Sequence, residues 1–192
     1  MKKNNCVIIG ASHAGVSLAM QLRREGWSHE IVLVSDDFQL PYHRPPLSKD
    51  FLNSKKGLDQ IRLRPEKAFE DNNIELRLGK EVTAVDIASK TLVLDDDEKL
   101  QYGKLAFCAG SKVKKIPQGE QFANVFYLRN AADAMRIQSS FSGKKRAVII
   151  GAGYIGLEVS AVLREKGIKV TVIDIAERIL ERVTSPYLSQ YM

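Results

Sequence analysis

Cysteine and long apolar runs are both scarce in this 192-residue sequence. Its two cysteines, Cys6 and Cys108, lie far apart and form neither a CxxC pair nor a spacing typical of metal ligands or secreted disulfides. No apolar run approaches the roughly 20 residues that a membrane-spanning helix needs. The basic start leads into a short apolar stretch that breaks into Gly, Ser and His, which indicates a core strand and not a signal peptide. We therefore expect a cytoplasmic protein with no membrane segment and no metal site.

The formal charge of +6 is unevenly distributed along the chain. Residues 1–110 balance 16 basic against 16 acidic side chains, whereas residues 111–192 hold 13 basic and 7 acidic ones. A solvated basic face is the plainer interpretation, and a docking surface for an acidic partner is the alternative. The basic residues are scattered and no recognition motif accompanies them, so we expect no nucleic-acid partner.

The chain contains an internal repeat. "CVIIGASHAGVSLAMQLRREGW" and "AVIIGAGYIGLEVSAVLREKGI" align without a gap, at an offset of 141 residues. Each copy predicts a strand, a glycine-rich turn and a helix, and is followed by a second apolar strand, "EIVLV" or "KVTVI". Uninterrupted Val, Ile and Leu runs are typical of parallel strands covered on both faces, and two such strands joined by a helix form a βαβ unit.

We accordingly predict an α/β fold with two Rossmann-like dinucleotide-binding units in series. The first domain is predicted at residues 1–112 and includes a small β-meander, in which the acidic run 95–98 forms a hairpin turn. The second domain is predicted at residues 113–192, with a helix over residues 130–141. It lacks the further strands of a doubly wound sheet, so we expect an incomplete unit that belongs to a longer protein.

The second glycine turn carries the more specific motif. "VIIGAGYIG" places Gly151, Gly153 and Gly156 between a predicted strand and a predicted helix, which suits a tight turn, a close approach to pyrophosphate and close packing. The helix start offers free amides to phosphate. Asp174 ends the next strand, where its carboxylate would bind ribose hydroxyls and repel a 2′-phosphate, so NAD is favoured over NADP. The alternative is a turn that merely packs. Further candidate contacts are Tyr154, Ile155 and Arg182.

The first glycine turn, "VIIGASHAG", predicts a second dinucleotide site at Gly10, Ser12 and Gly15. Ser12 takes the middle glycine position, where its Cβ narrows the approach but its hydroxyl could bind a phosphate oxygen. The ribose acid is either Asp36 or Asp37, both at the end of the next strand. His13 is interpreted first as a helix-start residue and secondly as a phosphate contact.

These motifs, together with "PYHRPPLSK", "KLAFCAGS", "YLRNAADA" and "VTVIDIAERILERV", resemble the ferredoxin reductase group of FAD-dependent pyridine nucleotide-disulfide oxidoreductases. Putidaredoxin and rubredoxin reductases belong to that group, whose members are longer than this chain. The resemblance covers the whole sequence in order. It implies FAD in the first unit and NAD in the second.

The resemblance also implies individual residue roles. Flavin contacts are expected at Ala14, Asp36, Lys49, Val82 and Arg129, with Arg44, Ala109 and Gly110 as further candidates. The segment at Phe107–Gly110 reads "FCAG" where members usually have "ATG", so either Cys108 or Ala109 replaces a threonine near the flavin. Lys49 is implied to lie near flavin N5 and to pair with Glu158. We therefore predict these two side chains, the candidate catalytic pair, within salt-bridge range.

The implied reaction is transfer of a hydride from NADH to flavin, followed by transfer of single electrons to a [2Fe-2S] ferredoxin-type or rubredoxin-type acceptor of an oxygenase system. A disulfide reductase is disfavoured, because no cysteine stands in the "PYHRPPLSKDFL" segment where its thiol would be expected. The alternative from another class is a truncated nucleotide-binding remnant without turnover.

Overall fold

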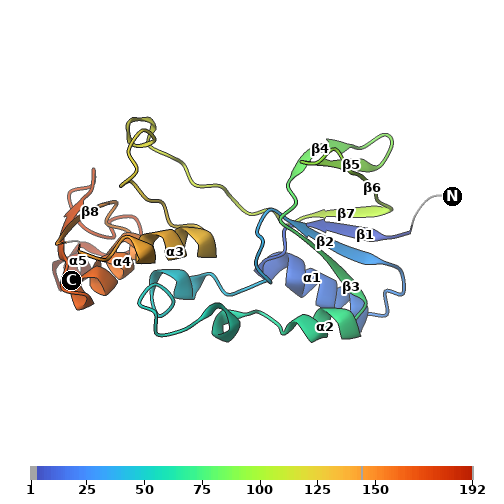
Figure 1. Cartoon of the computed structure of the whole chain (residues 1–192), viewed down its shortest axis with the longest axis horizontal. Coiled ribbons are helices and arrows are strands. Elements are labelled where there is room, and N and C mark those ends of the chain that lie inside the picture. The colour runs from blue at the N-terminus through green and yellow to red at the C-terminus, as the bar shows by residue number, and fades with distance from the viewer. Residues whose placement is uncertain (1–3, 144, 192) are drawn as a thin grey trace. The chain divides into compact units, whose positions relative to one another are not determined.

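The computed structural model describes residues 4–143 and 145–191 (Figure 1). The chain divides into two compact units, one comprising Met1–His43 and Leu58–Lys112 and the other Arg44–Gly57 and Val113–Met192. The predicted domains, residues 1–112 and 113–192, stay a prediction; residues 44–57, which that prediction placed in the first domain, group with the second unit of the structure. We describe each unit by itself below.

The first unit is built on a four-stranded parallel sheet of order β3-β2-β1-β7. Val32, Leu33 and Val34 of β2 are almost completely buried, because both faces of this central strand are covered. The strands of this four-stranded sheet are β1 (Cys6–Ile9), β2 (Ile31–Ser35), β3 (Ile74–Leu78) and β7 (Lys104–Phe107).

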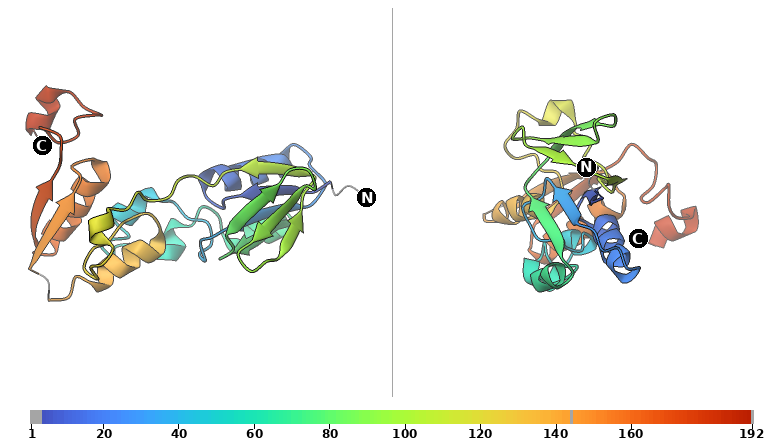
Figure 2. Two further views of the ribbon diagram at one scale, coloured as in Figure 1. Left: turned by 90° about the horizontal axis from the view of Figure 1, so that it is seen from above. Right: turned by 90° about the vertical axis from the view of Figure 1, so that its right-hand side faces the viewer.

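Two different layers cover this sheet, as the end-on view in Figure 2 shows. On one face, Ile8 and Leu33 pack with side chains of α1 (His13–Arg24) and with Phe69 of α2 (Glu66–Asp71). On the other, Val7 and Val34 pack against a three-stranded antiparallel sheet. That sheet consists of β4 (Val82–Asp86), β5 (Thr91–Leu94) and β6 (Lys99–Gln101). The α/β class and the meander of the first unit are thus as predicted.

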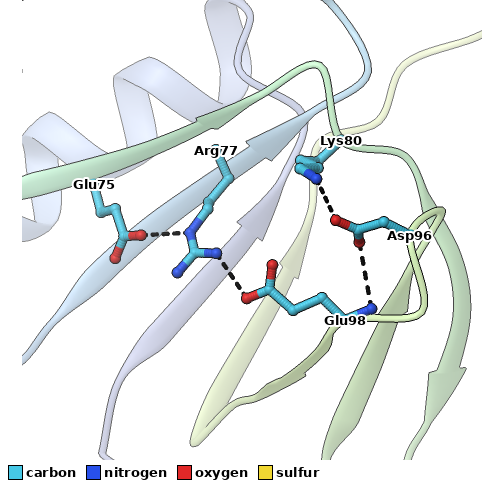
Figure 3. Close-up of polar contacts among 5 residues, drawn as sticks. All are labelled: Glu75, Arg77, Lys80, Asp96 and Glu98. Atoms are coloured by element: carbon cyan, nitrogen blue, oxygen red, sulfur yellow. Dashed lines mark hydrogen bonds and ion pairs between the residues drawn. The ribbon is translucent and has the colours of Figure 1, made fainter.

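A group of ion pairs connects the edge strand β3 to the hairpin of the smaller sheet (Figure 3). The Arg77 guanidinium binds Glu75 on its own strand and reaches Glu98 at 2.7 Å. Lys80 pairs with Asp96 in the hairpin turn. The acidic run 95–98 is a turn, as predicted, and basic side chains bind two of its carboxylates. Among residues 4–143 and 145–191, no three His, Cys, Asp or Glu side chains gather in a metal-binding arrangement.

The second unit has a parallel pair of strands, β8 (Arg146–Ile150) and β9 (Lys169–Ile173), joined by α4 (Tyr154–Glu165). The predicted helix before it is α3 (Ala131–Ser139), which begins with a capping box between Asn130 and Asp133. A last helix, α5 (Pro186–Tyr191), begins at the predicted proline.

The segment Arg44–Gly57 opens with the short 3₁₀ helix η1 (Pro45–Ser48) and packs against α3 and α4. Phe51 and Leu52 are buried, and the Gln138 side chain of α3 donates to the Phe51 carbonyl at 2.5 Å. The remaining 3₁₀ helices are η2 (Leu58–Ile61) and η3 (Pro117–Gly119). No helix in the described part of the chain is both long and apolar enough to traverse a bilayer.

Candidate nucleotide-binding sites

The two glycine turns have the same backbone geometry. Gly10 and Gly151 both adopt φ +108°, a conformation that L side chains rarely take. Each turn closes on its own helix: a Cβ on Gly15 would lie 1.9 Å from the Gly10 carbonyl oxygen, and a Cβ on Gly156 would lie 2.0 Å from that of Gly151. The two copies of the sequence repeat therefore form the same tight turn between a strand and a helix.

The helix that follows each turn begins without a side-chain cap. Ser12 is the N-cap of α1 and Gly153 that of α4, and neither helix start receives a side-chain hydrogen bond from its N-cap. An uncapped helix start presents backbone amides and the positive end of the helix dipole, which together suit phosphate. A Cβ built on Gly153 meets no atom within 4 Å, so the space above this residue is open. Both helix starts therefore suit the pyrophosphate of a dinucleotide, and the second turn also leaves open space for it.

The first turn differs from the second in having a strand-end segment against it. A Cβ on Gly10 would lie 2.2 Å from the carbonyl oxygen of Cys108, whose own amide donates to the Ile9 carbonyl at 2.7 Å. Ala109 and Gly110 follow directly, the latter with φ +71°. The structure thus brings these two predicted residues, which are about 100 positions away in sequence, beside the glycine turn.

The two acids after β2 differ in their hydrogen bonds. Asp37 accepts the Tyr42 hydroxyl on one oxygen at 2.6 Å and the Gln39 amide on the other at 3.1 Å. Asp36 is exposed at the carboxyl end of the strand. Asp37 supports the loop, so Asp36 is the acid available to a ligand at this strand end.

Sequence reasoning missed the neighbour of His13. The Nε2 atom of His13 lies 3.1 Å from Nδ1 of His43, and both rings are exposed. His13 begins α1, and His43 ends the first part of this unit just before the two prolines. The only hint in the sequence was the histidine in "PYHRPP", which has no fixed spacing to the glycine turn.

Asp174, at the end of β9, is tied to the second glycine turn. One carboxylate oxygen accepts the Ala152 amide at 2.5 Å and the other accepts the Ala176 amide at 2.8 Å. The hydrogen bond from Ala152, then that from Ala176 and the field of Arg182, lower the pKa of this carboxyl group. An ionised carboxylate has about four lone-pair directions, so it retains capacity for ribose hydroxyls. Tyr154 and Ile155, in the first turn of α4, are more than half exposed.

The predicted ion pair between Lys49 and Glu158 is confirmed. The Lys49 ammonium lies 2.7 Å from Oε1 of Glu158, and the side chains are 49% and 27% exposed. Burial acts to raise the pKa of Glu158, but hydrogen bonds from Lys49 and Ser48 outweigh it and leave the pKa below its ordinary value. Glu158 is therefore an ionised partner for the lysine.

The other residues implied by the resemblance are divided between the two units. Ala14 and Val82 lie in the first unit, with Ala14 exposed in the first turn of α1. Arg44, Lys49 and Arg129 lie in the second unit. Arg44 reaches the Arg129 carbonyl only at 3.4 Å, and the buried Nε of Arg129 has no hydrogen-bond partner among the described residues. A buried guanidinium nitrogen without a partner is consistent with an anionic ligand here.

Comparison with known proteins assigns the family. Residues 4–192 match the pyridine nucleotide-disulphide oxidoreductases. The chain belongs to this family. Its members use FAD and a pyridine nucleotide.

The relatives confirm the predicted resemblance to the ferredoxin reductase group. Putidaredoxin reductase of Pseudomonas putida is 38% identical over 192 residues, which are 98% of this chain and 46% of that protein. Rhodocoxin reductase of Rhodococcus erythropolis is 39% identical over 186 residues, 96% of this chain and 44% of that protein. Among solved structures, the covalent putidaredoxin reductase–putidaredoxin complex matches with a TM-score of 0.92 at 37% identity, covering 100% of this chain and 47% of the other. The chain thus spans about half the length of the curated relatives it matches.

The two cysteines of this family member, Cys6 and Cys108, are both free, and Cys6 is buried inside β1. Burial, followed by the nearby Cys108, raises the pKa of the Cys6 thiol and keeps it protonated, which is unfavourable for thiolate chemistry.

Proposed function

We propose that this chain is the part of an NADH-dependent flavoprotein ferredoxin reductase that binds FAD in its first unit and NADH in its second. The observation that supports this proposal best is the matching pair of glycine turns, each with a positive-φ glycine, an uncapped helix start and an acid at the next strand end. Such a turn suits the diphosphate of an adenine dinucleotide.

Each unit contributes its own set of residues to the proposed sites. In the first, the amides around Ser12 and Ala14 would hold the FAD pyrophosphate, and Asp36 the ribose. In the second, the turn Gly151–Gly156 would hold the NADH pyrophosphate, and Asp174 the ribose. When bound, FAD would supply hydride acceptance and single-electron release. The ion pair would hold the positive charge of Lys49 at a fixed place, which the resemblance puts near flavin N5.

The proposed electron acceptor is an iron–sulfur protein of the ferredoxin or rubredoxin type. The relatives named above act, by their names, on putidaredoxin and rhodocoxin, and a further relative is rubredoxin-NAD(+) reductase. Residues 111–192 carry 13 basic and 7 acidic side chains, a charge that would attract an acidic partner.

The test is a spectrum of the purified chain. A yellow protein with a flavin absorption band that bleaches on anaerobic addition of NADH supports the proposal, and subsequent reduction of an added ferredoxin supports the electron-transfer step. A Gly10→Ala variant is the matched control, because its Cβ would meet the Cys108 carbonyl and distort the first turn. A colourless wild-type chain that also takes up no added FAD would contradict flavin binding.

The second candidate function is a nucleotide-binding remnant without turnover. It is supported by the exposed apolar side chains on β8, where Val148 is 60% and Ile150 69% exposed. A chain that binds FAD or NADH but never passes a hydride between them would support this candidate.

A further inference from the structure

Ser48 lies beside the candidate catalytic pair, Lys49 and Glu158, although no sequence motif singled it out. Its hydroxyl donates to Oε2 of Glu158 at 2.5 Å, while the Lys49 ammonium binds Oε1 of the same carboxylate at 2.7 Å. Two adjacent residues thus bind one carboxylate, one on each oxygen. In the described part of the chain these are the polar side chains that contact Glu158.

The two donors differ in how firmly they are held. Ser48 is only 5% exposed, and its hydroxyl has a single proton and one rotatable bond. The Lys49 side chain is 49% exposed, has four flexible methylenes and makes an ion pair that solvent screens. A Glu158 carboxylate bound only by Lys49 would move with that flexible side chain. A carboxylate that also binds the buried Ser48 hydroxyl is held in one orientation.

The backbone that carries Ser48 is itself immobilised. Pro45 and Pro46 restrict φ at the start of η1, and the amides of Lys49 and Phe51 both donate to the Pro46 carbonyl at 3.0 Å. Leu47, which precedes the serine in the chain, and Phe51, which follows it, are both buried. The Pro45 carbonyl lies 3.4 Å from the Ser48 oxygen, too far to compete with Glu158 for its proton.

We propose that Ser48 is a positioning residue: its hydroxyl fixes the orientation of the Glu158 carboxylate, so that the other oxygen holds the Lys49 ammonium in one place. The order of dependence runs from the buried serine to the glutamate and then to the lysine. This inference rests on the proposed function only for what Lys49 does in the reaction. The hydrogen bond and the ion pair to Glu158 need no cofactor.

The first test uses the full-length chain without ligand. The carboxyl carbon of Glu158 is titrated by ¹³C NMR, with Glu158→Gln identifying its resonance. Ser48→Ala is expected to raise the pKa of Glu158 by about half a unit to one unit, because a hydrogen bond to the ionised form is lost. Ser48→Thr, which keeps a hydroxyl, is expected to restore the wild-type value, and Ser48→Cys, a weaker donor of similar size, to give an intermediate one.

The second test follows the lysine. The rate at which acetic anhydride modifies Lys49, measured by peptide mass spectrometry, is expected to rise several-fold in Ser48→Ala, because a disordered carboxylate stabilises the unreactive ammonium form less. Ser160→Ala is the matched control, since Ser160 lies two residues after Glu158 on α4 but donates to the Gly156 carbonyl at 2.7 Å. It should leave both the titration and the modification rate unchanged.

The third test applies to flavin-loaded chain. Ser48→Ala is expected to lower the rate constant of flavin reduction by NADH several-fold while leaving NADH affinity unchanged, and to shift its pH profile. If the chain takes up no flavin, the proposed function fails, yet the titration and the lysine modification still decide the role of Ser48. The inference is overturned if a folded Ser48→Ala variant retains the wild-type pKa of Glu158 and the wild-type reactivity of Lys49.

Discussion

The carboxylate of Asp174 accepts the backbone amide of Ala152 at 2.5 Å, so the end of β9 is tied to the middle of the second glycine turn. The same side chain that is expected to bind the ribose therefore also shapes the loop that is expected to bind the pyrophosphate. We therefore expect nucleotide affinity and loop geometry both to depend on the charge of Asp174.

Replacement of Asp174 by Asn tests this double role. The amide keeps the shape but loses the charged acceptor, and a hydrogen bond to a charged group contributes about 1.5–3 kcal/mol. We expect NADH affinity, measured by fluorescence titration of the chain, to fall about tenfold or more, and the preference over NADPH to narrow because the repulsion of a 2′-phosphate is gone. Glu177→Gln, at an exposed acid three residues further on, should have little effect. Unchanged NADH affinity in Asp174→Asn would remove this residue from the proposed site.

Two glycines of the same turn are expected to respond in opposite ways to alanine. At Gly156 the new Cβ would lie 2.0 Å from the Gly151 carbonyl oxygen, a backbone atom that cannot yield without moving the turn. At Gly153 the Cβ meets nothing within 4 Å and φ is −82°, which any residue adopts. We therefore expect Gly156→Ala to lower the free energy of unfolding by about 2 kcal/mol or more, in the range of severe backbone strain.

Gly153→Ala should unfold like the wild type but bind NADH less tightly, because the methyl group occupies the space for the pyrophosphate. Urea denaturation followed by circular dichroism and a binding titration measure the two effects separately. Equal stability of the two variants would show that the turn can shift to accept a Cβ at Gly156, against the 2.0 Å approach in the structure.

The ion pairs of Arg77 are expected to contribute modestly to the stability of the first unit. Arg77→Met removes its contacts with Glu75 and Glu98, and partly exposed pairs of this kind contribute up to about 1 kcal/mol each. The loss, measured by urea denaturation, should shrink at high salt because salt screens the pairs in the wild type. Arg64→Met is the control, since the exposed Arg64 donates only to a neighbouring carbonyl among the contacts described. A salt-independent loss would point to packing of the arginine stem instead.

The carboxylates that anchor segment 44–57 to α4 predict sensitivity of the second unit to acid. Hydrogen bonds from Lys55 and Asn53 lower the pKa of Glu165, and for Glu158 those from Lys49 and Ser48 outweigh burial. A carboxyl group whose pKa is lower in the folded than in the unfolded state stabilises the folded protein at pH values above its unfolded pKa of about 4.3. This stabilisation is lost as the pH falls through the folded pKa. The double variant Glu158→Gln, Glu165→Gln should therefore be less stable than the wild type at pH 6–7 and nearly equal to it at pH 3.

Thermal unfolding at several pH values, followed by circular dichroism, measures this difference. Glu177→Gln serves as the control and should track the wild type throughout. A stability difference that persists at pH 3 would mean that the glutamates act through packing and not through their charge.

Several features could not be predicted because they depend on contacts between residues far apart in the chain. The sequence left Asp36 and Asp37 as alternatives, and only the Tyr42 hydroxyl showed that Asp37 is engaged by the loop. It also gave no sign that His43 meets His13, or that Ser48 meets Glu158 across 110 residues. The pairing of Lys49 with Glu158 was expected only from the family resemblance.

What the amino-acid sequence determined by itself is the pair of glycine turns, since Gly10 and Gly151 meet a local need for positive φ and Gly15 and Gly156 a local need for close packing. Such requirements act within a few residues along the chain, so they can be predicted from the sequence alone. The tertiary structure alone decided that segment 44–57 packs on α3 and α4, because burial of Phe51 and Leu52 and pairing of charges depend on which surfaces the folded chain brings together.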